Sequence, residues 1–402
     1  MQNSHHQLII TLLALFTIAQ IVILLVFGYT PYPDSEGYIQ LANECVAKGE
    51  FYPVTSLLYD YPFLWNIGSI NAVACSLWLL HSVVPLLVLY VLMKGATAAL
   101  FYVLVKRISN HRIATISLLL YILYPANYGE ATSTLSELPF MFFMMAGLCL
   151  CIVNEKWLLG GMLLACGNWF RPMGIVFLLA IVLYLLFTKQ WKKTALPVIG
   201  YIAVIAIIGS ISYQRTGLFL YQAKTGWMAL TDYSTDHSKA SMVVRDNTNW
   251  NVAQKDSAWQ GLFVDWLHEH PKEYVAQMPR KLINTYVSDN VNMCTFIPDK
   301  NNKEYMYEEV SMPVLLHSFP HFSTVQWLTM LNLMFYYLLL ILALLSLFYF
   351  HRQEFLLPFS IIVLGTLLLL FVGHGEARFH IPFMPFIIML AAWFIHYQCK
   401  HE

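Results

Sequence analysis

Charged side chains are scarce in this chain: Asp, Glu, Lys and Arg make up 11% of its 402 residues, against roughly a quarter in an ordinary soluble domain. Hydrophobic residues make up 58%. This composition predicts an integral membrane protein. Neither sign of charge prevails, because 23 Lys and Arg balance 23 Asp and Glu. With no basic excess and no arginine-rich segment, recognition of nucleic acid is not expected.

Signatures of metal and redox sites are also missing. The seven cysteines form no C-x-x-C motif, and His374 and His380 have no third ligand at a metal-binding spacing, so neither a metal nor another cofactor is predicted. A disulfide between Cys45 and Cys75 stays open, because connectivity cannot be read from sequence. The first apolar run has neither a basic leader nor a small-residue cleavage site, and we expect an uncleaved signal anchor.

Long apolar runs are what the chain does have, and they predict an all-α polytopic protein with about ten transmembrane helices, since about 20 apolar residues cross a bilayer. The expected spans are 8–28, 91–105, 113–127, 138–153, 157–170, 173–187, 195–212, 325–350, 355–372 and 381–397. Lys and Arg gather in alternate short loops, which predicts that both termini are cytoplasmic. These basic residues are Lys106, Arg107, Arg112, Lys156, Lys189, Lys192, Lys193, Arg352 and Lys400.

Three parts are expected along the chain: a transmembrane core over 1–213, an extracytoplasmic insert over 214–323, and C-terminal transmembrane helices over 324–402. The core includes a first outer loop of about 29–90, whose aromatic residues predict one or two helices lying on the outer leaflet. A crossing at 91–105 puts Lys94 near the outer edge, where a charge costs less than at mid-membrane.

Polar residues gather at the outer ends of the predicted spans, and this one-sided collection predicts a cavity for an anionic polar ligand at the outer membrane face. They are Asp34, Glu36, Lys94, Glu130, Ser136, Glu137, Arg171, His374, Glu376, Arg378 and His380.

Several short motifs resemble the polyprenyl-phosphate-dependent GT-C glycosyltransferases. They are an aspartate just after the first span, Ser-Glu-Leu-Pro-Phe at 136–140, Asn-Trp-Phe-Arg-Pro-Met-Gly at 168–174, the stretch from 266 to 274, and Gly-Glu-Ala-Arg-Phe-His-Ile-Pro-Phe-Met-Pro-Phe at 375–386. The nearest group comprises bacterial relatives of the protein O-mannosyltransferases and of the lipid A aminoarabinose transferase. The likeness covers nearly the full length, and it indicates the superfamily rather than the substrate.

The resemblance implies a GT-C-like fold and a role for three residues. Asp34 matches the family's first-loop aspartate, the base that activates the acceptor; Glu137 matches the acid opening the fourth span, and Arg378 the late-loop arginine. Two departures are visible. Ser35 and Glu36 follow the aspartate in place of an adjoining acid, and no soluble domain follows the last span, which leaves acceptor recognition to the insert and the first outer loop.

Sugar transfer from a lipid phosphate requires the same kinds of residue. A sugar on a lipid phosphate already has a good leaving group, so the enzyme must deprotonate the acceptor and neutralise the departing phosphate. Asp34 is the predicted catalytic base. Substrate binding is assigned to Glu36, Lys94, Glu137, Arg171, Glu376, Arg378 and His380.

Each assignment has a structural alternative. Asp34 is also suited to cap a helix, and Glu36 to be a solvated first-turn acid. Glu137 could belong to a helix start with Ser136. Either Arg171 or Lys94 could snorkel to the membrane surface. Arg378 could form an ion pair with Glu376 that holds the loop.

The function expected from these observations is an inverting glycosyltransferase at the outer face of the cytoplasmic membrane. It would move one sugar from a polyprenyl-phosphate donor, such as undecaprenyl phosphate, to a glycan, lipid or protein acceptor of the cell envelope. A flippase or transporter of lipid-linked sugar is an alternative, although transporters place ionisable groups near the bilayer midplane and show related halves, and neither is evident in the sequence. A polysaccharide polymerase or ligase is another.

Overall fold

The computed structural model describes residues 2–30, 32–50, 65–235, 238–289, 312–317, 319–349, 353–373 and 375–399. Every regular element in these ranges is a helix, which confirms the predicted all-α class. Of the basic residues used to orient the chain, Arg352 and Lys400 lie outside the described part.

Six helical segments are long and apolar enough to cross a membrane. They contain α1 (Gln2–Phe27), α4 (Val84–Ile108), α9 (Ala195–Thr216), α15 (Thr324–Ser346), α16 (Leu356–Val372) and α17 (Met384–Gln398), the last preceded by the 3-10 helix η7 (Ala377–Phe383). A seventh crossing is possible where the 3-10 helix η2 (Pro125–Thr132) meets α6 (Glu137–Ile152), with a bend of 117° between them.

The remaining expected spans are helices too short for a full crossing. They are α5 (His111–Leu123), α7 (Trp157–Phe170) and α8 (Gly174–Phe187). A helix of 13 residues such as α5 extends only about 20 Å at 1.5 Å per residue, against a hydrocarbon core of about 30 Å. A multi-pass helical membrane protein is therefore supported, whereas the number ten is not.

Proline explains two boundaries that the sequence analysis misplaced. The helix predicted over 113–127 ends at Leu123, because Pro125 starts the 3-10 helix η2 instead. The crossing predicted over 91–105 begins at Val84, with Pro85 in its first turn, where a missing N–H costs nothing. The first outer loop therefore ends before residue 84, and Lys94 lies well inside α4 rather than near its edge.

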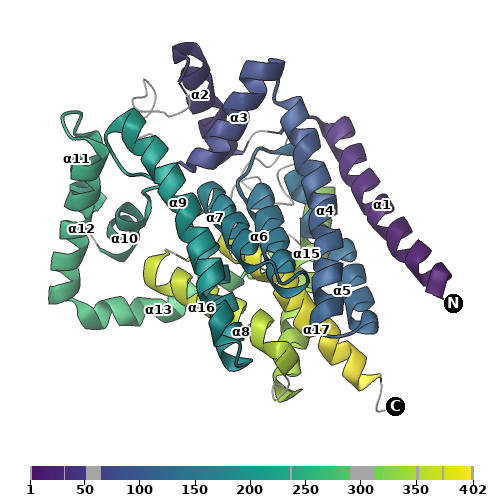
Figure 1. Ribbon diagram of the computed structural model, residues 1–402. Helices are drawn as coiled ribbons and strands as arrows, with labels where there is room; N and C mark the ends of the chain where they lie inside the picture. Colours follow the sequence, from purple (N-terminus) through teal and green to yellow (C-terminus); the bar gives the residue numbers. More distant parts are fainter. Residues whose placement is uncertain are drawn as a thin grey trace.

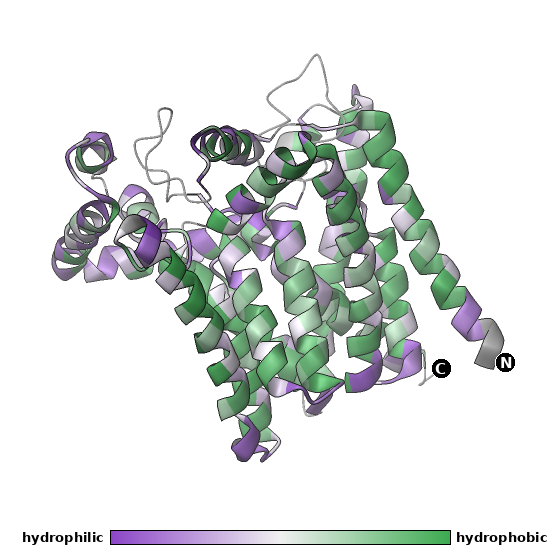
Figure 2. Cartoon of the chain, turned by 45° about the horizontal axis from the view of Figure 1, so that its top comes forward, coloured by the Kyte–Doolittle hydropathy of each residue, from purple (hydrophilic) through white to green (hydrophobic). Residues whose placement is uncertain are grey.

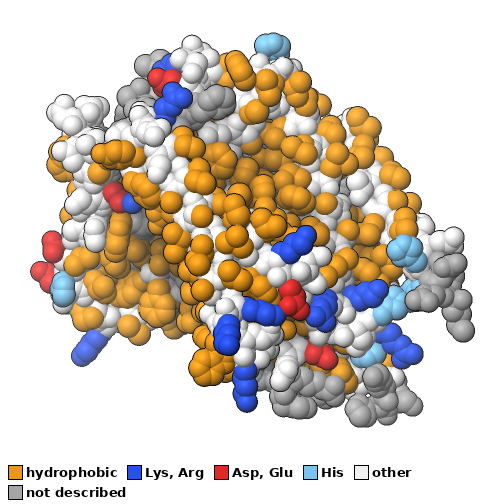
Figure 3. All heavy atoms as spheres, in the orientation of Figure 1, with side chains coloured by type: hydrophobic (Ala, Val, Ile, Leu, Met, Phe, Trp, Pro, Cys, Tyr) orange, Lys and Arg blue, Asp and Glu red, His pale blue; other side chains and the backbone are white. Residues whose placement is uncertain are grey.

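The helices form a bundle with different coverings at its two ends (Figure 1). Two helices, α2 (Pro33–Lys48) and α3 (Ile67–Leu80), lie across one end. Both chain termini lie toward the opposite end. Hydrophobic residues dominate the middle of the bundle, and hydrophilic ones its lower end and the flanking helices (Figure 2). Figure 3 shows the same division on one face, where a wide hydrophobic surface is followed by a group of Lys and Arg side chains.

The insert folds into short helices beside the bundle. They are α10 (Gly226–Ser234), α11 (Ser238–Asp246), α12 (Val252–Glu269), α13 (Pro271–Tyr286) and α14 (Met312–Leu316). Trp259 is fully buried and donates its indole N–H to Ser241 at 2.9 Å. The same hydrophobic cluster includes Ile67 of α3, and the Tyr274 hydroxyl donates to the carbonyl of Phe371 in α16 at 2.6 Å. The insert thus packs on the bundle, as its thin hydrophobic content leads one to expect.

Glycines allow α7 and α9 to lie backbone to backbone. A Cβ atom on Gly161 would collide with the carbonyl of Pro197, and one on Gly200 with the carbonyl of Leu158. Both positions therefore require the absence of a side chain.

Candidate functional site

Four separate parts of the chain bring charged residues together at the end of the bundle that α2 and α3 cover. The first turn of α2 carries Asp34, α6 begins with Glu137, and Arg171 follows directly after α7. Glu376 and Arg378 lie at the start of η7, between α16 and α17. We call these five residues the arginine cluster.

Arg378 makes the central contacts of the arginine cluster. Its Nη2 lies 2.6 Å from Oδ2 of Asp34, and its Nε lies 3.0 Å from Glu376 and 3.8 Å from Glu137. The guanidinium also lies over the ring of Tyr32, 5.4 Å from its centroid. Nη1 is buried and has no hydrogen-bond partner among the described residues, so a ligand could bond to it only after neighbouring side chains move aside.

Glu137 is the buried anchor of the same cluster. Nη1 of Arg171 donates to its Oε1 at 2.6 Å, and the hydroxyl of Ser136 donates to its Oε2 at 3.1 Å. Phe379 stacks on the other side of Arg171, with 5.1 Å from guanidinium carbon to ring centroid. An unpaired buried charge costs free energy, so Arg171 and Glu137 stabilise each other by pairing. The pair also holds Glu137 in place beside Arg378.

Exposure increases across the cluster from Glu137 to Asp34. The exposed side-chain fraction is 1% for Glu137, 7% for Arg171 and 11% for Arg378, but 24% for Asp34 and 28% for Glu376. A ligand can therefore reach the Asp34 and Glu376 side. Burial raises the pKa of Asp34 above its usual value, although the nearby Arg378 works in the opposite direction.

The geometry decides several of the structural alternatives. Asp34 is not an N-cap, because α2 begins at Pro33 after Tyr32, with no side-chain capping hydrogen bond. Arg171 does not snorkel, since it is buried against Glu137. The expected ion pair between Arg378 and Glu376 is present, together with the pair to Asp34. Glu36 is exposed on α2 and takes no part in the cluster's ion pairs.

Lys94 and His380 lie apart from the arginine cluster, in a second group of buried charges that we call the inner cluster. Nζ of Lys94 donates to Glu130 at 2.5 Å, and the two side chains are 7% and 3% exposed. This replaces the expectation of a snorkelling lysine near the outer edge. Glu130 comes from η2, 36 residues further along the chain, which no local sequence pattern reveals.

His380 supplies the other half of the inner cluster. Its Nδ1 lies 2.6 Å from the carbonyl oxygen of Thr285, and its Nε2 lies 3.3 Å from Oδ1 of Asp289. Since a carbonyl only accepts, Nδ1 carries a hydrogen. Nε2 faces the Asp289 carboxylate, but it has no hydrogen-bond partner of good geometry among the described residues. Burial raises the pKa of Asp289, and His380 opposes this shift.

A small cavity of about 20 Å³ joins the two pairs of the inner cluster. Lys94, Glu130 and Asp289 line it with Asn127 and Tyr124. This is room for about one water molecule among polar groups. Sequence reasoning missed Asp289, because a single aspartate in a polar loop gives no signal of burial.

Metal and disulfide sites are not formed by the described residues. They contain no group of three or more His, Cys, Asp or Glu placed to hold a metal ion, and His374 lies outside them. Cys45 is buried and Cys75 is exposed, and both are free thiols.

In comparisons with known proteins, no family model matches this chain and no curated protein matches its sequence. The two clusters and the short motifs that carry them are therefore the features of this chain that bear on its function.

Proposed function

We propose that the protein is an inverting glycosyltransferase that moves one sugar from a polyprenyl-phosphate donor to an envelope acceptor. The observation that carries this proposal is the pairing of a partly exposed carboxylate, Asp34, with the guanidinium of Arg378, whose buried Nη1 has no hydrogen-bond partner among the described residues. An inverting transfer from a phosphodiester needs one base and one fixed cation near each other.

The reaction follows from these two groups. Asp34 accepts the proton of an acceptor hydroxyl or amine while the acceptor atom attacks the anomeric carbon. The bond from that carbon to the phosphate oxygen breaks, and the electron pair leaves with the polyprenyl phosphate. Attack on the face opposite the phosphate inverts the anomeric configuration, and no covalent sugar intermediate is needed.

Arg378 is suited to the leaving phosphate because Nη1 still has an unused N–H group while Nη2 contacts Asp34. Since Nη1 is buried, donor binding must displace the side chains that cover it. Three carboxylates and two guanidinium groups give the arginine cluster one formal negative charge in excess, which opposes binding of an anion. Donor affinity must therefore also come from the polyprenyl chain, at about 0.8 kcal/mol per buried CH₂ group. The exposed hydrophobic surface of the bundle in Figure 3 offers a place for it.

The remaining assignments extend this proposal. Glu137 and Arg171 hold Arg378 in position, and Glu376 and Glu36 contact the sugar or the acceptor. Lys94 and His380 would reach substrate only if the inner cluster opens, because both are now buried. The active site faces the outside of the cytoplasmic membrane in this proposal, with both termini inside.

Donor dependence tests the proposal. Purified protein in detergent is given a polyprenyl phosphate carrying one radiolabelled sugar, with a membrane extract of the source cells as acceptor mixture. We expect label in the acceptor fraction and release of polyprenyl phosphate, without any ion gradient. Transfer only from a lipid-linked oligosaccharide would instead indicate a polymerase or ligase, and absence of transfer from either donor would contradict glycosyl transfer.

A transporter of lipid-linked sugar is the second candidate, and one observation favours it. Lys94 and His380 both lie within candidate spans, close to Glu130 and Asp289. This corrects the sequence expectation, since ionisable groups inside membrane segments are typical of transport pathways. Movement of the labelled donor across proteoliposomes, with no release of polyprenyl phosphate, would support this candidate.

A further inference from the structure

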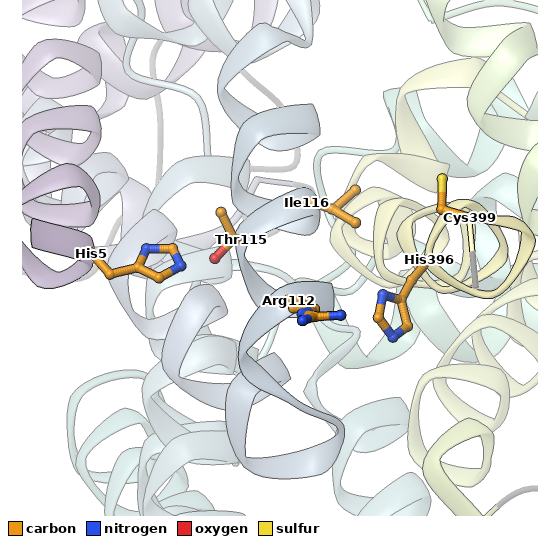
Figure 4. A pocket seen from close by; sticks show the side chains of 6 residues that line it. All are labelled: His5, Arg112, Thr115, Ile116, His396 and Cys399. Carbon is orange, nitrogen blue, oxygen red and sulfur yellow. The ribbon is translucent and has the colours of Figure 1, made fainter. Parts of the chain in front are cut away.

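A second pocket lies at the end of the bundle away from the arginine cluster. Its volume is about 340 Å³, and it opens between α1, α5 and α17 near the two chain termini. Its lining residues are His5, Arg112, Thr115, Ile116, His396 and Cys399. Figure 4 shows the guanidinium of Arg112 extending from α5 toward the imidazole of His396.

Among the described residues, the lining of this pocket carries positive charge and no carboxylate. Arg112 is permanently charged, and no ion pair to it is found among the described residues. The imidazole rings of His5 and His396 add ring nitrogens to the lining, and the ring of His111 lies 3.9 Å from that of His5, centroid to centroid. The lining therefore suits an anion, with a fork of N–H donors from Arg112 that matches a phosphate.

The pocket lies at the ends of two candidate membrane spans. The candidate span of α1 begins at His5, and that of α17 ends at Gln398, two residues after His396. Residues at such positions lie at the boundary between hydrocarbon and water. Basic pockets between transmembrane helices at this depth are suited to anionic lipid headgroups.

We propose that this pocket binds a phosphate group, carried by an anionic phospholipid or free in solution. Such a ligand would bridge α1, α5 and α17. The effect is greatest on α1, of whose apolar window only 22% is buried, against 78% for the segment that ends in α17. A bound phosphate would fasten the start of this loosely packed helix to the bundle.

Alkylation of Cys399 reports occupancy, because this exposed thiol lines the pocket. The delipidated full chain in detergent is treated with N-ethylmaleimide, and modification of each cysteine is followed by peptide mass spectrometry. Cys75, exposed on α3, is the internal control. One series adds phosphatidylglycerol, a second phosphatidylcholine, and a third inorganic phosphate.

We expect phosphatidylglycerol to slow alkylation of Cys399 but not of Cys75, and phosphatidylcholine to have a much smaller effect. Arg112→Gln should raise the protecting concentration about fivefold, the contribution of one basic residue near an anionic lipid. Arg107→Gln, an exposed arginine at the end of α4 that does not line the pocket, is the matched control.

The outcomes separate the sources of the phosphate. Protection by inorganic phosphate alone, lost in Arg112→Gln, would assign the pocket to a soluble phosphate compound. Protection that is equal for both lipids, unchanged in Arg112→Gln, or weakened as much by Arg107→Gln would overturn the proposal.

Discussion

Asp34 is the residue on which the proposed chemistry depends. Asparagine is nearly isosteric but cannot accept a proton as a carboxylate does. Asp34→Asn should therefore reduce turnover roughly a hundredfold or more, the range for loss of a positioned base, with folding and donor binding largely intact. The measurement is single-sugar transfer by the purified variant.

Glu36→Gln is the comparison for this change, because Glu36 lies on the same turn of α2 but outside the arginine cluster. As a substrate contact with no part in proton transfer, it should change turnover only a few-fold. Since the pKa of Asp34 is raised, wild-type activity should fall on the acid side at a pH above the ordinary range of aspartate, where the base becomes protonated. Turnover of Asp34→Asn near the wild-type level would refute the catalytic role.

Arg378 is expected to bind the donor through its planar fork. Arg378→Lys keeps the charge but loses the geometry that contacts Asp34, Glu376 and a phosphate at once. This variant should weaken donor binding about tenfold, which corresponds to the loss of about one charge-assisted hydrogen bond. Quenching of tryptophan fluorescence by a polyprenyl-phosphate sugar measures the affinity, and an unchanged affinity would make Arg378 a purely structural partner of the two acids.

Sequence reasoning selected the residues of the arginine cluster because each lies next to the outer end of a predicted span. Asp34, Glu137, Arg171 and Arg378 do come together, because the helices that carry them end at the same side of the bundle. The same reasoning wrongly placed Lys94 and His380 in one site with these four residues. Their partners, Glu130 and Asp289, are distant in sequence, and only the packing of α4 against η2, and of α13 near η7, decides which charges meet.

Among the elements, α4 and η2 are joined by a buried ion pair whose removal can be tested in two steps. Lys94→Met leaves Glu130 buried without this partner and should cost about 3–5 kcal/mol of stability. The double variant Lys94→Met, Glu130→Gln should recover most of the loss. Thermal unfolding in detergent gives both values, and equal instability of single and double variants would contradict a mainly electrostatic role for the pair.

The contact between α7 and α9 is limited by glycine. Gly161→Ala places a methyl group against the backbone of Pro197, and such overpacking should cost about 1–3 kcal/mol. Gly261→Ala in α12 is the matched control, because nothing lies within 4 Å of the added carbon; it should be neutral or stabilise by up to about 1 kcal/mol. If both variants melt alike, the close approach of α7 and α9 is not what limits stability.

At the scale of the whole molecule, one candidate span, Trp191–Arg215, separates the basic turn at Lys192 from the insert. Cysteine introduced for Glu269, whose side chain is 78% exposed, should react in intact cells with an impermeant thiol reagent. Cysteine introduced for Lys192 should react only after the membrane is opened. Labelling of both from the same side would contradict the proposed orientation and the outward-facing arginine cluster.

Hydropathy predicted most helices of the bundle, because helices buried in lipid and helices buried in protein are both rich in apolar residues. For the same reason, hydropathy does not distinguish a helix that crosses the membrane from a buried helix that does not, so it could not give the number of crossings. α5, α7 and α8 are as apolar as the candidate spans but shorter, so they differ from the long helices in length rather than in composition.

The contact between His380 and Thr285 has a consequence for the order of folding. It joins the start of the last candidate span to the end of α13, across 95 positions of the sequence. Contacts between residues far apart in sequence form only after the chain between them has been placed, because closing a long loop costs entropy. The centre of the bundle should therefore become ordered late, once the C-terminal helices have packed.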